Sequence, residues 1–164
     1  MTYYNPVLHY GLDEFCRDSG RAGVDGLIIP DLPPEEGTEL AVAAQAHGLD
    51  LIYLLAPTST EARIRLVAAQ SGAFIYMVST TGVTGARESL AGGLVDFVAR
   101  VRGITAMPLC VGFGISTPVQ AREVAAIADG VIVGSRIVQL MAEGDDSSSL
   151  GGFIKGLRGA LDAP

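Results

Sequence analysis

Short apolar runs alternate with longer amphipathic segments along most of this chain. Such runs are typical of strands buried on both faces of a parallel sheet, and they cover residues 24–29, 51–55, 73–78, 108–112 and 130–133. Helical periodicity follows each run, over residues 35–47, 60–70, 90–101, 117–127 and 137–142. Thr60 is the expected N-cap of the second of these helices. The alternation predicts right-handed βα units in one parallel sheet.

The two ends of the chain differ from this pattern. Asn5-Pro6 is a turn signal, so residues 1–10 are predicted as the end of a strand and a loop. Because this segment is rich in aromatic and apolar residues, we expect it to be buried beside a segment that precedes it. Residues 12–22 are predicted as a helix, residues 144–149 as a solvated loop, and a last amphipathic helix starts at Leu150.

Two architectures contain this number of units, an open doubly wound sheet and part of an eight-stranded barrel. The open sheet predicts a dinucleotide fingerprint after the first strand, but the loop there is Pro30-Asp31-Leu32-Pro33-Pro34. Glycine and hydroxyl residues follow the last two strands instead, where barrels hold phosphate. We therefore predict an α/β fold of the parallel (β/α)8 TIM type. Residues 1–164 would form one domain with about five of the eight units, and the first three strands would lie upstream of Met1.

Composition and charge narrow the class of partner. The chain has 164 residues, of which 49% are hydrophobic, and a net charge of −7. That charge argues against non-specific binding to nucleic acid or to an acidic membrane. Cys16 and Cys110 form no CxxC pair, and His9 and His47 have no partner at ligand spacing, so we expect reduced thiols, no metal site and a cytoplasmic location. The sequence shows neither a signal-peptide pattern nor an apolar run of membrane-spanning length.

The turns after the last two strands carry the candidate anion site. Residues 111–116 and 131–135 both run from an apolar strand into glycine and a hydroxyl residue. Glycine lets the backbone approach a ligand closely, and the N–H groups that start the next helix favour an anion. The alternative is that these glycines only serve tight turns. Residues 82–87, which include Thr84 and Arg87, could form a lid that closes over the substrate or a mobile surface loop. The expected phosphate ligands are Gly85, Gly114, Gly134 and Ser135.

Apolar side chains near the strand ends could line a pocket beside that anion; they are Tyr3, Ile28, Leu54, Tyr76, Phe113 and Ile132. As a set they would suit a flat aromatic substrate with a phosphorylated tail, although each could equally belong to the core. Asp31 ends the first strand of the pattern. Its carboxylate could act as an acid or base, cap the following helix or pair with a partner chain.

Five stretches of the chain resemble, in order, the tryptophan synthase alpha subunit family. They are Thr2-Tyr3-Tyr4-Asn5-Pro6, Asp31-Leu32-Pro33-Pro34-Glu35-Glu36, Tyr76-Met77-Val78-Ser79-Thr80-Thr81-Gly82-Val83-Thr84-Gly85, Gly112-Phe113-Gly114-Ile115-Ser116 and Gly134-Ser135. The match covers essentially the whole chain, and the third stretch is highly diagnostic. The resemblance implies a lyase of tryptophan biosynthesis that cleaves indole-3-glycerol phosphate, in a retro-aldol step, to indole and glyceraldehyde 3-phosphate.

The resemblance also implies roles for individual residues. Gly85, Gly114, Gly134 and Ser135 would hold the phosphate, Tyr76 and Phe113 would contact the indole side, and Thr84 would lie in the closing lid. Asn5 and the loop of Asp31 and Pro33 would face a beta subunit in an alpha2-beta2 complex. Pyridoxal phosphate would belong to that beta subunit, and the alpha subunit would need no cofactor.

The family's catalytic Glu and Asp correspond to positions upstream of Met1. We therefore expect no catalytic residue in this chain and no activity from the chain alone. Two other functions stay open: a non-catalytic fragment that binds phosphate or a partner, and another sugar-phosphate barrel enzyme. The second needs a lysine or a carboxylate pair at strand ends, and Lys155 in the last helix is the only lysine.

Overall fold

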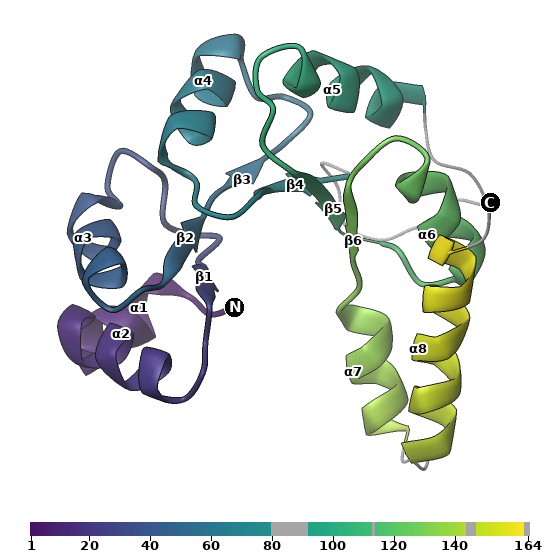
Figure 1. Ribbon diagram of the computed structural model, residues 1–164, viewed down its shortest axis with the longest axis horizontal. Helices are drawn as coiled ribbons and strands as arrows, with labels where there is room; N and C mark the ends of the chain where they lie inside the picture. The colour runs from purple at the N-terminus through teal and green to yellow at the C-terminus, as the bar shows by residue number, and fades with distance from the viewer. Residues whose placement is uncertain (80–91, 113, 144–146, 163–164) are drawn as a thin grey trace. The chain divides into compact units, whose positions relative to one another are not determined.

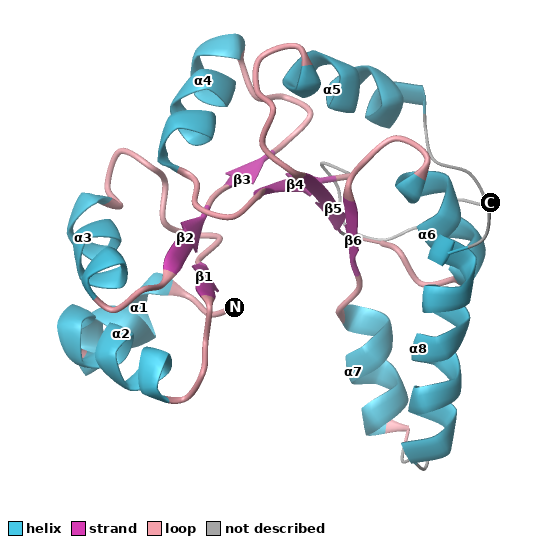
Figure 2. Cartoon of the chain, in the orientation of Figure 1, coloured by secondary structure: helices cyan, strands magenta, loops and turns pink. Residues whose placement is uncertain are grey.

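The computed structural model describes residues 1–79, 92–112, 114–143 and 147–162 (Figure 1). Helices alternate with short strands through these residues (Figure 2). The chain divides into two compact units, and the division falls within one strand. The first unit comprises Met1–Leu55, Ser59–Tyr76 and Ile104–Met107, and the second comprises Ala56–Thr58, Met77–Gly103 and Pro108–Pro164.

The first unit contains most of the N-terminal half of the chain. Its elements are α1 (Tyr4–Tyr10), α2 (Leu12–Arg21), β1 (Gly26–Ile28), α3 (Thr38–Ala46), β2 (Asp50–Ile52), β3 (Leu54–Leu55), α4 (Glu61–Gln70) and the start of β4 (Ile75–Val78). β1 and β2 pair in parallel, with Leu27 opposite Leu51. β3 neighbours β4 in a second sheet.

Buried aliphatic side chains fill the space between these strands and helices. Leu27 and Leu51 on the strands, Leu40 on α3 and Ile64 on α4 are each at most 5% exposed. Burying an aliphatic side chain of this size stabilises the fold by about 1.5–3 kcal/mol. α4 begins where the sequence predicts it, because the Thr60 hydroxyl accepts a hydrogen bond from the Arg63 backbone N–H at 3.3 Å.

The second unit contains the remaining strands. Its elements are the end of β4, α5 (Gly92–Arg102), β5 (Leu109–Gly112), α6 (Pro118–Ala125), β6 (Gly130–Ile132), α7 (Ser135–Ala142) and α8 (Ser147–Asp162). The strand order is β4-β5-β6. β5 and β6 are parallel, with Val111 opposite Val131 and Gly112 opposite Ile132. α8 packs along α6 and α7 (Figure 1).

Asp129 fixes the starts of β5 and β6. Its carboxylate accepts a hydrogen bond from the Leu109 backbone N–H at 2.8 Å and another from the Arg102 guanidinium. Its own backbone N–H donates to the Leu109 carbonyl at 2.9 Å. The hydrogen bond from Arg102 and that from Leu109 lower the pKa of the Asp129 carboxyl. Because the two strands start in register, they also end side by side at Gly112 and Ile132.

The predicted βα alternation is confirmed, but three local predictions are wrong. Residues 4–10 form the helix α1, not a strand end and loop, and most of their apolar side chains are exposed. Residues 51–55 form two strands, because the Tyr53 N–H donates to the Ser71 hydroxyl at 2.9 Å instead of continuing the ladder. Residues 147–149 belong to α8 rather than to a solvated loop.

The N-terminal prediction failed for an identifiable reason. Pro6 lies in the first turn of α1, where the missing N–H of proline costs no helical hydrogen bond. The Tyr4 N–H donates to the carboxylate of Asp31, which lies 27 positions further along the chain. A turn signal read from Asn5-Pro6 alone carries no information about that distant acceptor.

Candidate functional site

The candidate anion site lies in the second unit, where the chain leaves β5 and β6. Since these strands are parallel and end side by side, both following turns leave from the same edge of the sheet. Gly114 lies in the first turn, Gly134 is the N-cap of α7, and Ser135 is the first residue of that helix. All three residues are exposed. Gly85, the fourth predicted ligand, lies outside the described residues.

The two glycines differ in their backbone conformation. Gly114 has a φ of +76°, in the left-handed region that other L-residues adopt at a cost. Gly134 has a φ of −125° and a ψ of −71°, outside the left-handed region. A Cβ atom built on either glycine would meet no atom of the other described residues within 4 Å, its chain neighbours aside. Among the described residues, the space in front of Gly134 is therefore open to a ligand, and no neighbouring atom demands glycine there.

The first N–H groups of α6 are already bonded within the chain. Thr117 and Gln120 form a capping box, in which the Thr117 hydroxyl accepts from the Gln120 N–H at 3.2 Å. The Gln120 side-chain oxygen accepts from the backbone N–H groups of Ser116 at 2.9 Å and Thr117 at 3.2 Å. Pro118 has no N–H to donate. This turn can therefore offer an anion few amides beyond that of Gly114.

The start of α7 is different, because its N-cap residue, Gly134, has no side chain and no side-chain cap is found there among the described residues. Its first backbone N–H groups have no acceptor within the helix, and its first residue, Ser135, carries a hydroxyl. The Arg136 guanidinium lies 3.6 Å from the Glu143 carboxylate near the other end of α7. An anion at this site would therefore be bound by backbone N–H groups, the helix dipole and one hydroxyl.

The predicted apolar pocket residues lie at or near strand ends. In the first unit, the Thr2 N–H donates to the Ile28 carbonyl at 3.1 Å, which places Tyr3 beside the end of β1. Ile28 and Leu54 are half-buried, whereas Tyr3 is 67% exposed. Tyr76 is only 4% exposed, and burial raises the pKa of its phenol. Ile132 is half-buried in the second unit. Phe113, Thr84 and Arg87 lie outside the described residues.

The predicted partner-facing residues are brought together in the first unit. Asn5 is exposed on α1, and Pro33 is half-buried in the turn after β1. Both carboxylate oxygens of Asp31 lie within hydrogen-bond distance of the Tyr4 N–H, at 2.9 and 3.1 Å. Asp31 therefore caps α1, the helix that precedes it, and not the helix that follows as one sequence-based alternative held.

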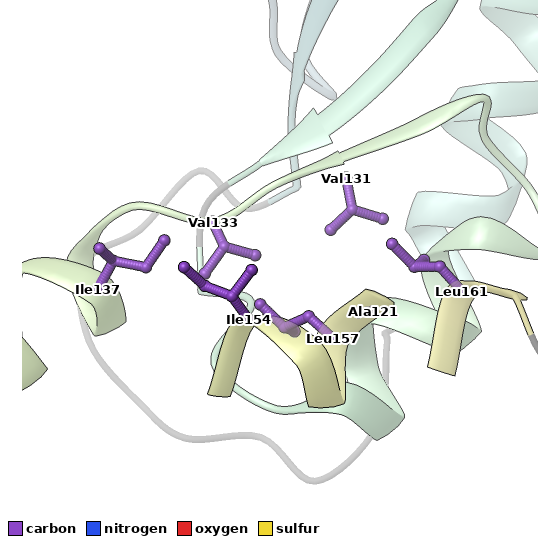
Figure 3. Close-up of a pocket in the computed structure, with 7 residues that line it drawn as sticks. All are labelled: Ala121, Val131, Val133, Ile137, Ile154, Leu157 and Leu161. Carbon is purple, nitrogen blue, oxygen red and sulfur yellow. The ribbon is translucent and has the colours of Figure 1, made fainter. Parts of the chain in front are cut away.

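Sequence reasoning missed an apolar cavity of about 260 Å³ in the second unit. It lies between β6, α6, α7 and α8, and Figure 3 shows the side chains that line it, which are those of Ala121, Val131, Val133, Ile137, Ile154, Leu157 and Leu161. The spacing of the last three along α8 was the available signal, because it marks one face of that helix. The lining offers only aliphatic side chains, so it contains no side-chain group that could orient a polar ligand.

Metal binding and thiol chemistry have little support within the described ranges. There, no group of three or more His, Cys, Asp or Glu side chains could hold a metal ion. Cys16 and Cys110 are free thiols, and burial raises the pKa of each. Among the helices in this part of the chain, none is long and apolar enough to cross a membrane.

The chain is similar to proteins of one family over nearly all of its length. Residues 1–151 match the family model described as tryptophan synthase alpha chain. The tryptophan synthase alpha chain of Dehalococcoides mccartyi is 54% identical over 162 residues, which are 99% of this chain and 64% of that relative. The alpha chain of Geotalea uraniireducens is 54% identical over 166 residues, which are 99% of this chain and 62% of the relative. The chain thus spans less than two thirds of the length of these curated relatives.

Solved structures agree with this assignment. A Mycobacterium tuberculosis tryptophan synthase chain superposes with a TM-score of 0.89 at 42% identity, with 100% of this chain and 62% of that chain covered. An Aquifex aeolicus protein superposes with the same TM-score of 0.89 at 40% identity, over 99% of this chain and 61% of that one. These neighbours confirm the predicted α/β barrel class, and the strands of the described residues do not form a closed sheet. The chain belongs to the tryptophan synthase alpha chain family.

Proposed function

We propose that these residues belong to a lyase that cleaves indole-3-glycerol phosphate to indole and glyceraldehyde 3-phosphate in tryptophan biosynthesis. The part assigned to this chain is to hold the substrate phosphate through Gly114, Gly134 and Ser135, with Gly85 as a fourth ligand. One observation carries the proposal: the uncapped start of α7 and the open space in front of Gly134, on the sheet edge that Gly114 shares.

The chemistry of this edge suits a phosphate group. Each backbone N–H or hydroxyl hydrogen bond to a charged oxygen is worth about 1.5–3 kcal/mol. The dipole of α7 adds about 0.3–1 kcal/mol for an anion at its start. Backbone groups can bind phosphate without a basic side chain, so the net charge of −7 is no obstacle.

Holding the phosphate would serve catalysis by fixing one end of the substrate. Binding energy from a non-reacting group can orient the reacting bond, so the phosphate site contributes although it makes no contact with the bond that breaks. The indole ring is proposed to contact the apolar side chains at strand ends, with Thr84 in a closing segment; these side chains are Tyr3, Ile28, Leu54, Tyr76, Phe113 and Ile132.

The partner is part of the same proposal. A tryptophan synthase beta chain would receive the indole in a cytoplasmic alpha2-beta2 complex, bound at Asn5 and at the turn that holds Asp31 and Pro33. Pyridoxal phosphate would belong to the beta chain, and the chain described here would act without a cofactor of its own. The name of the solved M. tuberculosis relative, tryptophan synthase, supports this assignment.

Calorimetric titration with glyceraldehyde 3-phosphate tests the proposal. Wild-type chain should bind, and Ser135→Ala should bind about tenfold more weakly, because one hydrogen bond to a charged oxygen is lost. Ser116→Ala is the matched control, since its hydroxyl lies in the neighbouring turn and is 3.3 Å from the Gln120 side-chain oxygen. Its affinity should stay within about twofold of wild type. Absence of heat with wild-type chain, or equal losses in both variants, would overturn the phosphate assignment.

A further inference from the structure

The turn between β1 and α3 is a rigid platform. Leu32 is 3% exposed and Pro34 is buried, so the turn is anchored in the core of the first unit. The Leu32 N–H donates to the Ile29 carbonyl at 3.1 Å, and the Glu36 N–H donates to the Pro33 carbonyl at 3.0 Å. Prolines at positions 30, 33 and 34 fix their backbone φ angles.

Two contacts hold the far end of the same turn. The Glu35 carboxylate accepts a hydrogen bond from the Arg63 guanidinium at 2.6 Å. The side chain of Tyr53, only 3% exposed, fills the space next to Gly37, where a Cβ atom would overlap its hydroxyl group. Residues 29–37 therefore have little freedom to move relative to the core beneath them.

α1 is weakly held by comparison. It has seven residues, and Val7 is its one buried side chain. Helices this short are not stable on their own in water. The side chain of Tyr3, the N-cap residue of α1, makes no capping hydrogen bond. The start of α1 is fixed from outside, by the Asp31 carboxylate on the Tyr4 N–H and by the hydrogen bond from the Thr2 N–H to the Ile28 carbonyl.

Large apolar side chains are exposed along this segment. Tyr3 is 67% exposed, Leu8 53% and Tyr10 57%. Asn5 and Pro6 are exposed between them. An exposed cluster of large apolar and amide side chains is typical of a protein-binding surface. The Asp31 carboxylate is exposed and keeps its charge, but both of its oxygens lie within hydrogen-bond distance of the Tyr4 backbone N–H.

We propose that Asp31 is a positioning residue for partner binding, which holds α1 on the rigid turn of residues 29–37. This inference rests on the proposed function, in which a beta chain binds this face. The partner would be bound by the uncharged side chains of Tyr3, Asn5 and Leu8, and its matching surface would be apolar with hydrogen-bonding groups for the Asn5 amide. Asp31 would make no ion pair with the partner, and its effect would pass through the Tyr4 N–H.

Two substitutions separate positioning from a direct ionic contact. Asp31→Ala removes both acceptor oxygens, whereas Asp31→Asn removes the charge and keeps one oxygen that can accept from Tyr4. Binding to the tryptophan synthase beta chain of the same organism, measured by calorimetry, should weaken about tenfold in Asp31→Ala, the size expected for a lost N-cap. It should stay within about threefold of wild type in Asp31→Asn. Glu36→Ala, an exposed carboxylate in the same turn, is the matched control and should bind like wild type.

Amide hydrogen exchange of Tyr4 in the free chain gives a readout that does not involve the partner. Protection should be kept in wild type and in Asp31→Asn, and lost in Asp31→Ala. Equal loss of partner binding in both Asp31 variants, with Tyr4 still protected in Asp31→Asn, would show a direct ionic contact and overturn the proposal. Failure of the wild-type chain to bind the beta chain would also overturn the proposal. If the Tyr4 amide were still protected in that case, Asp31 would hold α1 as described, and the choice of the beta chain as partner would be wrong.

Discussion

The turns that follow β5 and β6 start from the same edge of one sheet, but the helices that follow them differ in how their first backbone N–H groups are bonded. At α6, Thr117 and Gln120 bond the first amides, so the helix start is stabilised from within the chain. At α7, Gly134 offers no side chain, and the first amides keep their capacity to bind a ligand. Similar sequences, glycine followed by a hydroxyl residue, thus produce one closed helix start and one open one. An anion site therefore needs the absence of a cap as well as the presence of glycine.

Filling the open start with a charged cap should have the largest effect. Gly134→Asp places a carboxylate where the phosphate is proposed to bind, and the backbone φ of −125° and the empty space around a Cβ allow the residue. Glyceraldehyde 3-phosphate binding should fall by about a hundredfold or more, because like charges would meet. The melting temperature should rise, since Asp is a good N-cap. Calorimetric titration and a thermal scan measure the two effects.

Gly134→Asn is the control for this variant, because it adds a cap of the same shape without the charge. The loss of affinity for glyceraldehyde 3-phosphate should be smaller in this variant than in Gly134→Asp. Wild-type affinity in Gly134→Asp, in a variant whose melting temperature shows that it folds, would contradict the placement of the anion at α7.

Removing the cap at the start of α6 should have a smaller effect, and it should change the stability of the fold and not phosphate binding. Thr117→Ala removes the acceptor for the Gln120 N–H and so breaks the capping box of α6. The free energy of unfolding should fall by about 1 kcal/mol, the typical cost of a lost N-cap. Urea denaturation measures this change. Phosphate affinity should stay within about twofold, and a tenfold loss would mean that the α6 turn contributes as much as α7.

Removing the charge of Asp129 should have the smallest effect on the free energy of unfolding, and this effect should depend on pH. Its pKa is lowered in the folded chain by Arg102 and by the Leu109 N–H, so its ionised form stabilises the fold. That stabilisation is present above the ordinary Asp pKa of about 4 and is lost as the pH falls through the lower folded-state value. Because the side chain is 46% exposed, the contribution should be at most about 1 kcal/mol after screening.

Asp129→Asn tests this expectation. Urea denaturation at neutral pH should show a less stable variant, and the difference from wild type should shrink as the pH is lowered below about 4. A difference that does not change with pH would attribute the loss to packing rather than to the charge. Since Asp129 sets the common start of β5 and β6, the variant also tests whether their register matters for the two turns that follow.

The local signals in the sequence were sufficient for most of the elements. Apolar runs located the strands, and Thr60 marked the start of α4 as predicted, because a cap and its N–H partner are three residues apart. The strand of residues 51–55 was predicted as continuous, yet Ser71 interrupts it at Tyr53. The interruption could not be predicted, since the two residues are distant in the sequence and no local pattern links them.

The candidate site was predicted in position but not in detail. Gly114, Gly134 and Ser135 were selected because glycine and hydroxyl residues follow apolar runs, and the structure places them on one sheet edge. The two turns are alike in sequence, because the hydrogen bonds from the Ser116 and Thr117 amides to the Gln120 side chain appear only in the structure. The roles of these residues in binding phosphate stay a prediction until the titrations are made.

The sequence by itself determined the order of the βα units, since burial on two faces demands continuous apolar runs and amphipathic helices between them. It also determined the family, through motifs that occur in the family's order. Only the tertiary structure decided that residues 4–10 form a helix, and that α7 has an open start whereas α6 has a closed one. The physical reason is the same in both cases. A backbone N–H group binds whichever acceptor the fold brings to it, and the fold can bring that acceptor from a distant position, as it brings Asp31 to Tyr4.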